Sequence, residues 1–167
     1  HPFIVPKMMH NAAASNIAKR YSLKGVTYSV SSACASSNHA IANAFNLIKF
    51  GEARVMIAGG SDAMLTFGGM KAWEGLRVLS KTGCRPFCLS RDGLVQGEGA
   101  AVFVLEEYTH AYKRGANILA EIKGCSMTSD GYDLVAPSTD GMKKAIMKSL
   151  YDSGISADDV DYVNAHG

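Results

Sequence analysis

The chain has 167 residues, which is room for about one domain on the usual scale of roughly 100–200 residues per domain. Its composition is 47% hydrophobic and 19% charged, which permits a sizeable core and argues against disorder. The 17 basic and 15 acidic residues give a net charge of +2, so charge alone does not indicate a nucleic-acid-binding protein. No apolar run approaches the roughly 20 residues that span a bilayer, so we expect no membrane span.

Cysteine usage and the two ends of the chain set further expectations. The four cysteines, at positions 34, 84, 88 and 125, are too few and too irregular for a disulfide scaffold, which favours a reducing, cytoplasmic setting. The chain begins His1-Pro2 without a charged-then-apolar leader, so no signal peptide is expected. Residues 160–167 read as a strand entering a polar turn, and we expect the chain to be a segment of a longer protein.

Short apolar runs alternate with stretches of helical period, which is typical of an α/β fold. A β-branched and aromatic run predicts a strand over 26–30. Apolar residues at three- and four-residue spacing predict a helix over 37–50, ended by Gly51. The next predicted strand, 54–58, is apolar enough to be buried on both faces and is expected to break at Gly59-Gly60.

The same rhythm continues and then restarts. The later predicted elements are a helix around 70–79, a loop over 84–99, a buried strand at 100–105, a helix over 106–114, a strand at 118–123, a helix over 141–153 stopped by Gly154, and a strand at 160–164. Because the β-α-β pattern restarts near 114–118, we expect two sub-structures, residues 1–115 and 116–167.

Cys34 is the strongest candidate for a chemical role. It follows a predicted strand, opens a predicted helix and has only small neighbours, from Ser31 to Ser37. A thiol at a helix N-terminus meets the macrodipole and unpaired N–H groups, which favour the thiolate and can hold an oxyanion. A small buried cysteine without chemistry is the competing interpretation, and the spacing alone does not decide between them.

His166 is the second candidate, because it stands just past a predicted strand, where α/β folds place ligands and catalytic groups. A turn histidine without a role is the alternative. His39 makes a poor partner for Cys34, since five residues correspond to roughly 140° around a helix.

No metal site or cofactor is expected. Cys84 and Cys88 are separated by Pro86 and have no second pair at zinc spacing. The glycines of segment 93–99 precede a strand instead of following one, which is the wrong order for a dinucleotide loop; they are expected to allow close strand packing. A basic run within 70–90 fits an acidic partner or a solvated face.

Several motifs, taken in order, resemble those of the β-ketoacyl-acyl-carrier-protein synthases. They are Ser32–Ser37, Ala58–Ala63, Arg85-Pro86-Phe87, Arg91-Asp92-Gly93, Gly97–Ala100 and the ending Tyr162–Gly167, which resembles the family's first active-site histidine motif. The resemblance runs from about Pro2 to Gly167 and is greatest to the discrete elongating (type II) enzymes and their nodulation-type relatives. It implies the thiolase-like fold, a five-layered α-β-α-β-α arrangement of two similar halves.

The resemblance also implies a reaction. Cys34 would take an acyl group from an acyl-carrier-protein thioester, and malonyl-carrier protein would then lose carbon dioxide. His166 would donate a hydrogen bond to the malonyl thioester oxygen and stabilise the enolate. Arg77 resembles the family's basic residue at the carrier-protein docking surface, and Trp73 falls near the acyl pocket.

Further expectations follow from the same resemblance: fatty-acid biosynthesis without a cofactor or metal, and a homodimer in which strand 26–30 pairs across the dimer axis. Cys88 stands where the family commonly has an acidic residue, which we interpret as structural variation. The family's second histidine, its lysine and its glycine-rich loop are expected after position 167, so the segment alone is expected to be catalytically incomplete.

Two other functions stay open. One is a non-catalytic partner subunit of the chain-length-factor type, which the intact surroundings of Cys34 argue against. The other is thiolase-type chemistry on coenzyme A thioesters, although segments 97–100 and 164–167 favour condensation.

Overall fold

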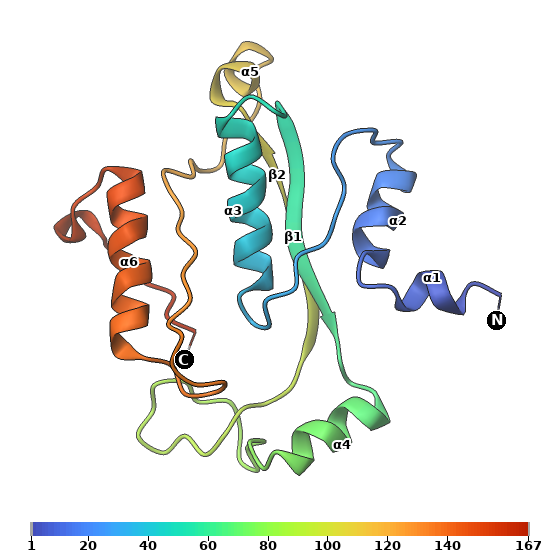
Figure 1. Ribbon diagram of the computed structural model, residues 1–167, viewed down its shortest axis with the longest axis vertical. Helices are drawn as coiled ribbons and strands as arrows, with labels where there is room; N and C mark the ends of the chain where they lie inside the picture. Colours follow the sequence, from blue (N-terminus) through green and yellow to red (C-terminus); the bar gives the residue numbers. More distant parts are fainter. Residues whose placement is uncertain (1, 167) are drawn as a thin grey trace. The chain divides into compact units, whose positions relative to one another are not determined.

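The computed structural model describes residues 2–166 and combines helices with strands, as the α/β pattern predicts (Figure 1). In chain order the elements are α1 (Ile4–Met8), α2 (Ala12–Arg20), α3 (Ser36–Lys49), β1 (Val55–Ala63), α4 (Phe67–Gly75), β2 (Glu98–Glu106), α5 (Tyr108–Lys113), α6 (Thr139–Ser153) and a 3-10 turn at Ala157–Asp159. The chain divides into two compact units, residues 1–59 with 102–159 and residues 60–101 with 160–167.

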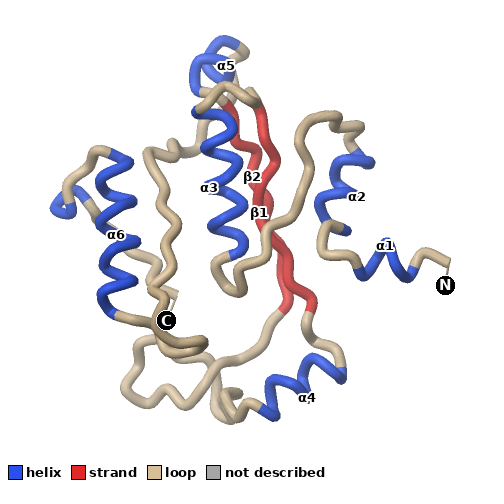
Figure 2. The backbone as a smooth tube through the Cα atoms, in the orientation of Figure 1, coloured by secondary structure: helices blue, strands red, loops and turns tan. Residues whose placement is uncertain are grey.

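β1 and β2 pair as a two-stranded sheet, and β2 returns in the direction opposite to β1 (Figures 1 and 2). The prediction that the strand over 54–58 would break at Gly59-Gly60 is wrong, because β1 continues to Ala63. Glycine can adopt the extended backbone conformation of a strand, and pairing with β2 continues the strand past these two glycines. Burial on both faces is also wrong: Ala58 is the buried residue of β1, and β2 is exposed over 98–104.

The predicted strands over 26–30, 118–123 and 160–164 do not form. Within residues 2–166 the sheet consists of β1 and β2, and none of these segments pairs with either strand. A β-strand satisfies its N–H and C=O groups on a neighbouring strand, so a β-type sequence alone does not make one.

The two longest helices match their predictions. α3 begins at Ser36 and ends at Lys49, two residues before Gly51, which has a left-handed φ of 79°. α6 begins after Ser138, whose hydroxyl accepts the Gly141 N–H at 3.1 Å, and ends at Gly154 with a φ of 70°. A serine cap at the start and a left-handed glycine at the end are the usual boundary signals of a helix.

Side-chain caps also fix the starts of α4 and α5. The Thr66 hydroxyl accepts the Gly69 N–H at 3.1 Å, so α4 begins at Phe67, before the predicted start near residue 70. The Glu107 carboxylate accepts the N–H groups of Thr109 and His110 at 2.9 and 2.7 Å, which starts α5. A carboxylate at this position also interacts favourably with the helix dipole.

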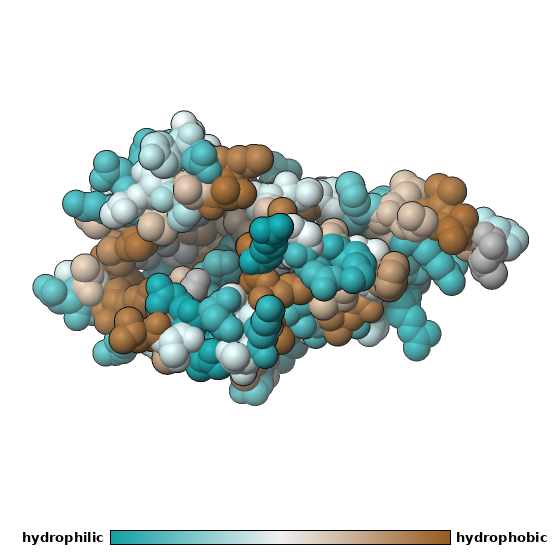
Figure 3. All heavy atoms as spheres, turned by 90° about the horizontal axis from the view of Figure 1, so that it is seen from below, coloured by the Kyte–Doolittle hydropathy of each residue, from teal (hydrophilic) through white to brown (hydrophobic). Residues whose placement is uncertain are grey.

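Buried side chains are few and small. Within the described part of the chain the buried apolar residues are Ala42, Ala44, Ala58 and Ala111. Large apolar side chains lie on the surface, as Figure 3 shows for one face; Phe103 of β2 is 55% exposed. Little of the apolar surface of the described residues is therefore buried within this chain.

Asp152 joins the C-terminal ends of α3 and α6 through the segment between them. One of its carboxylate oxygens accepts from Lys49 Nζ at 3.0 Å, and the other accepts the backbone N–H of Cys125 at 2.9 Å. Gly124 permits this approach, because a Cβ there would lie 2.5 Å from the Ser153 nitrogen. The far end of α3 is thus anchored to α6.

Candidate active site

Cys34 lies in a tight turn that leads into α3. The helix begins at Ser36 with Ala35 as its N-cap, so the thiol stands two residues before the first helical residue. The cysteine is exposed, so the interpretation of a small buried cysteine does not describe it. Ala33, immediately before it, has a left-handed φ of 47°, a conformation that costs a residue with a Cβ of order 1–3 kcal/mol. The turn therefore holds backbone strain next to the thiol.

The Ser36 hydroxyl closes this turn. It accepts the Ser32 N–H at 2.7 Å and donates to the Ala33 carbonyl oxygen at 2.7 Å. Two backbone bonds run parallel to these, from Ser36 N–H to the Ala33 oxygen and from Ala35 N–H to the Ser32 oxygen, both 3.1 Å. Four hydrogen bonds thus close the short turn that contains Cys34.

The backbone N–H of Cys34 is open. Among the described residues no acceptor is bonded to it, and the N-cap Ala35 has no side-chain group that could cap α3. Unpaired N–H groups at the start of a helix carry partial positive charge. Such groups favour a nearby thiolate and stabilise an oxyanion formed beside it.

The other predicted site residues lie in the unit formed by residues 60–101 and 160–167. His166 is exposed and has a left-handed φ of 75°. Trp73 is half-buried in α4, and Arg77 is exposed just past the end of that helix, where its N–H bonds to the Glu74 carbonyl at 3.0 Å. Within the described part of this unit no hydrogen bond joins His166 to Trp73 or to Arg77. The roles expected for the three stay predictions.

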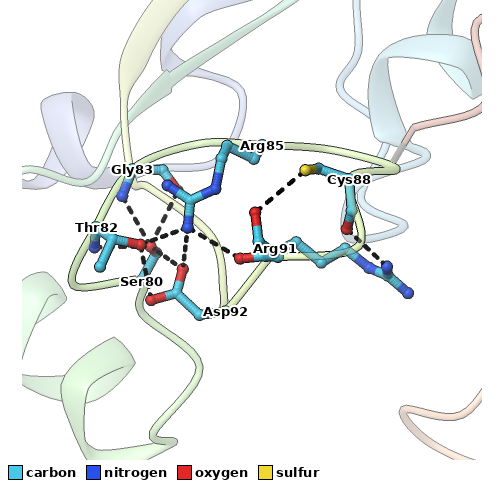
Figure 4. A network of polar contacts seen from close by, with 8 residues as sticks. Ser80, Thr82, Gly83, Arg85, Cys88, Arg91 and Asp92 are labelled. Carbon is cyan, nitrogen blue, oxygen red and sulfur yellow. Dashed lines mark hydrogen bonds and ion pairs between the residues drawn. The ribbon is translucent and has the colours of Figure 1, made fainter.

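A polar loop over 80–92 belongs to the same unit (Figure 4). Asp92 accepts the hydroxyls of Ser80 and Thr82 at 2.5 and 3.0 Å and forms an ion pair with Arg85 at 3.3 Å. The Ser80 hydrogen bond is the main reason that the pKa of Asp92 lies below its usual range. Gly93 is required beside it, because a Cβ there would lie 2.5 Å from the Val78 oxygen.

The sequence analysis placed Arg85 and Asp92 in two separate motifs and did not predict that they bond to each other. A possible signal was their presence in one short loop rich in serine and threonine. It also missed Ser36, for which the signal was a hydroxyl two residues after the candidate nucleophile. The close strand packing expected at Gly97 and Gly99 does not occur, since nothing lies within 4 Å of a Cβ built at either.

The described residues contain no group of three or more His, Cys, Asp and Glu side chains placed to hold a metal ion. None of the helices among them is both long enough and apolar enough to cross a membrane.

Comparison with known families assigns the chain. The family model described as Beta-ketoacyl synthase, N-terminal domain, matches residues 1–111, about two thirds of the chain. The chain belongs to the β-ketoacyl synthase family. The model of the family's C-terminal domain matches residues 119–167, so the assignment covers both sides of the expected boundary.

Curated members of the β-ketoacyl synthase family extend this result. Nodulation protein E of Rhizobium leguminosarum bv. trifolii is 51% identical over 165 residues, which are 99% of this chain and 41% of that protein. The 3-oxoacyl-[acyl-carrier-protein] synthase 2 of Rhizobium meliloti (strain 1021) is 38% identical over 175 residues, 99% of this chain and 42% of that protein. The chain thus spans about two fifths of the length of these relatives, and the expected likeness to nodulation-type enzymes is confirmed.

Solved structures of β-ketoacyl synthases share the fold. A β-ketoacyl synthase from Burkholderia phymatum STM815 superposes with a TM-score of 0.92 at 40% identity, covering 97% of this chain and 41% of that one. A type II polyketide ketosynthase in complex with its acyl-carrier protein gives a TM-score of 0.89 at 33% identity, over 97% of this chain and 42% of that one. The expected thiolase-like fold is confirmed, and the chain forms part of it.

Proposed function

We propose that the protein containing this chain is a 3-oxoacyl-acyl-carrier-protein synthase, which lengthens an acyl chain by two carbons through decarboxylative Claisen condensation. One observation carries the proposal: Cys34 is exposed in a strained turn before α3, beside its own open N–H, in a member of the β-ketoacyl synthase family. The relative named 3-oxoacyl-[acyl-carrier-protein] synthase 2 supports the substrate class.

The first half-reaction charges the cysteine. The Cys34 thiolate attacks the carbonyl carbon of an acyl-carrier-protein thioester, and a new carbon–sulfur bond forms. Negative charge develops on the carbonyl oxygen, where the backbone N–H of Cys34 can stabilise it. The carrier thiolate then leaves and takes up a proton, and the acyl group remains on Cys34.

The second half-reaction makes the carbon–carbon bond. The neutral imidazole of His166 donates an N–H hydrogen bond to the thioester oxygen of malonyl-carrier protein. The carbon–carbon bond to the malonyl carboxylate breaks and carbon dioxide leaves. The electron pair of the broken bond stays on the remaining thioester and forms the enolate. The enolate carbon attacks the acyl carbonyl on Cys34, the cysteine thiolate leaves, and the 3-oxoacyl chain stays on the carrier.

Several further assignments belong to this proposal. Residues 1–115 form the later part of the N-terminal half and 116–167 the start of the C-terminal half; the separate family matches to 1–111 and 119–167 support this division. Arg77 contacts the carrier protein, and the exposure of its side chain supports this role. Trp73 contributes to the acyl pocket. The solved ketosynthase–carrier complex supports the choice of partner. The protein acts as a cytoplasmic homodimer in fatty-acid biosynthesis.

Transfer of an acyl group to Cys34 tests the proposal. The whole protein is incubated with acyl-carrier protein, and its intact mass is measured. We expect a gain of one acyl group that is lost in Cys34→Ala and kept in Cys84→Ala, which removes another exposed cysteine. Addition of malonyl-carrier protein then releases a 3-oxoacyl product.

Two other results would each support a different function. A wild-type protein that accepts no acyl group, either from acyl-carrier protein or from acyl-coenzyme A, fits a non-catalytic subunit of the chain-length-factor type. A protein charged by acyl-coenzyme A but not by acyl-carrier protein fits thiolase-type chemistry. Either result contradicts the condensing-enzyme proposal.

A further inference from the structure

We propose that Ser36 is a positioning residue for the Cys34 nucleophile, and that its hydroxyl sets the direction of the Cys34 backbone N–H. The inference rests on the proposed function, in which that N–H stabilises the oxyanion. It comes from three observations: the left-handed φ of Ala33 and the two hydrogen bonds of the Ser36 hydroxyl.

The two hydrogen bonds of the Ser36 hydroxyl hold the chain on both sides of the strained φ torsion of Ala33. A serine hydroxyl has one proton and two lone pairs, so it can donate and accept at once. Here it accepts from Ser32 N–H, which precedes the φ torsion of Ala33, and donates to the Ala33 oxygen, which follows it, both at 2.7 Å. A rotation of Ala33 toward an ordinary negative φ would move these two partners apart and break at least one of the bonds.

The same two hydrogen bonds set the direction of the Cys34 N–H. The Ala33 carbonyl and the Cys34 N–H belong to one planar peptide group, and in a trans peptide they point in opposite directions. The described residues contain no cis peptide bond. The Ala33 oxygen is held by the hydroxyl and by the N–H of Ser36, at 2.7 and 3.1 Å. The Cys34 N–H is therefore aimed away from Ser36 and stays free for an oxyanion.

A general role in stabilising α3 does not account for this geometry. Ser36 is the first residue of the helix, and the N-cap position belongs to Ala35. The Ser36 hydroxyl bonds backward, to two residues that precede the helix, and both bonds lie around Cys34. Loss of the hydroxyl should therefore affect the turn and the oxyanion donor more than the helix.

The test compares two reactions of the same thiol in the whole protein. Acylation by acyl-carrier protein passes through an oxyanion, whereas alkylation by iodoacetamide does not. We expect Ser36→Ala to slow single-turnover acylation about 5- to 30-fold, the factor that one or two kcal/mol correspond to. Alkylation should change by less than about 2-fold, as for a substitution outside such features.

Two matched variants serve as controls. Ser36→Thr keeps the hydroxyl and should restore acylation to near the wild-type rate. Ser37→Ala removes the neighbouring, exposed hydroxyl, which has no partner among the described residues, and should acylate like the wild type.

A second substitution keeps the inference testable if Ser36→Ala folds poorly. Glycine adopts a positive φ without the Cβ penalty, so Ala33→Gly relieves the strain that the hydroxyl holds in place. In the Ala33→Gly background the added Ser36→Ala should slow acylation by less than about half of its effect alone on a logarithmic scale, because residues that share one interaction do not act additively.

The outcomes separate this inference from the proposed function. A wild-type protein that takes no acyl group contradicts the proposed function itself. A wild type that is acylated, beside a Ser36→Ala variant acylated equally fast, overturns only the role of Ser36. Equal slowing of acylation and alkylation also overturns it, because the hydroxyl would then act on thiol access or on folding.

Discussion

Lys49 Nζ lies 3.0 Å from a carboxylate oxygen of Asp152, so an ion pair joins the last turns of α3 and α6 although the two residues are 103 positions apart. The other end of α3 carries the Cys34 turn. The helix that presents the proposed nucleophile is thus anchored by a residue of the segment matched to the family's C-terminal domain.

The Asp152 contacts should make the stability of the protein depend on pH. Hydrogen bonds, first from Cys125 N–H and then from Lys49, hold the pKa of Asp152 below its ordinary value of 3.8. A carboxyl group with a lowered pKa contributes stability above its unfolded value, and this is lost as the pH falls through the folded value. Thermal unfolding midpoints should therefore fall more steeply below pH 4 for the wild type than for Asp152→Asn.

At neutral pH the same substitution should lower the midpoint. Asp152→Ala should lower it more than Lys49→Ala, because the alanine at 152 also leaves the Cys125 N–H unpaired. Glu121→Gln is the control: its pair with Lys123 is exposed on both sides and should contribute little. Equal midpoints for Asp152→Ala and the control would contradict the prediction.

Glu106 should act over a wider pH range. Its carboxylate accepts from both Nε and a terminal nitrogen of Arg114, at 2.8 and 2.6 Å, and also contacts His110 Nδ1. Arg114 is the main cause that lowers the pKa of Glu106 from 4.5 to about 2. The stability that this carboxylate contributes should persist above pH 4.5 and disappear as the pH falls toward 2. Acid titrations followed by circular dichroism should show a shallower loss of folded structure in Glu106→Gln than in the wild type. In Arg114→Lys the lysine lacks the forked donors of arginine, so it should not restore this acid stability.

Gly124→Ala should destabilise the protein by about 1–3 kcal/mol, the usual cost of forcing extra volume into a packed site. The added Cβ would lie 2.5 Å from the Ser153 nitrogen and 2.8 Å from the Asp152 carbonyl carbon, both of them backbone atoms. Gly75→Ala is the matched control, since nothing lies within 4 Å of a Cβ at that helical position. Urea unfolding of the two variants measures the difference, and a Gly124→Ala variant as stable as Gly75→Ala would refute the close approach.

Two cysteines should differ in reactivity. The Ser90 hydroxyl lies 3.2 Å from Cys88 Sγ and lowers the pKa of that exposed thiol, whereas burial raises the pKa of Cys125. Because the thiolate is the reactive form, iodoacetamide near pH 8 should modify Cys88 faster than Cys125. Peptide mapping by mass spectrometry gives both rates, and Ser90→Ala should slow only that of Cys88. Faster modification of Cys125 would contradict the prediction.

His166→Ala should separate the two half-reactions. The variant should still take an acyl group onto Cys34, because the role proposed for His166 belongs to the second half-reaction. Condensation should fall by about 10²–10³-fold, as when one oxyanion donor is removed from other enzymes. Intact mass reports the acylation and product analysis reports the condensation. A loss of acylation would show that His166 has a different role.

The two longest helices were the most predictable part of the fold, whereas α1 and α2 were not predicted. The boundaries of α3 and α6 follow from apolar residues at helical spacing and from Gly51 and Gly154, whose left-handed backbone stops a helix. The strands were less predictable, because pairing decides them. β1 continues through Gly59-Gly60 where β2 lies beside it, and segment 26–30 stays unpaired despite its β-type sequence.

The site divides in the same way. Cys34 stands out in sequence because its neighbours are small and a helix follows. Ser36 does not, since its two hydrogen bonds depend on the left-handed torsion of Ala33, which residue spacing does not reveal. Nor does the Arg85–Asp92 pair, because the two residues are brought together by an irregular loop with no period to read.

The small set of buried alanines has a calorimetric consequence. The heat-capacity change of unfolding grows with the apolar area that becomes exposed, and for a globular domain of this length it is roughly 2–2.5 kcal/mol/K. Here most large apolar side chains are already exposed in the folded chain. Residues 1–167 on their own should therefore absorb heat over a broad, shallow transition, with little curvature in the dependence of their folding free energy on temperature.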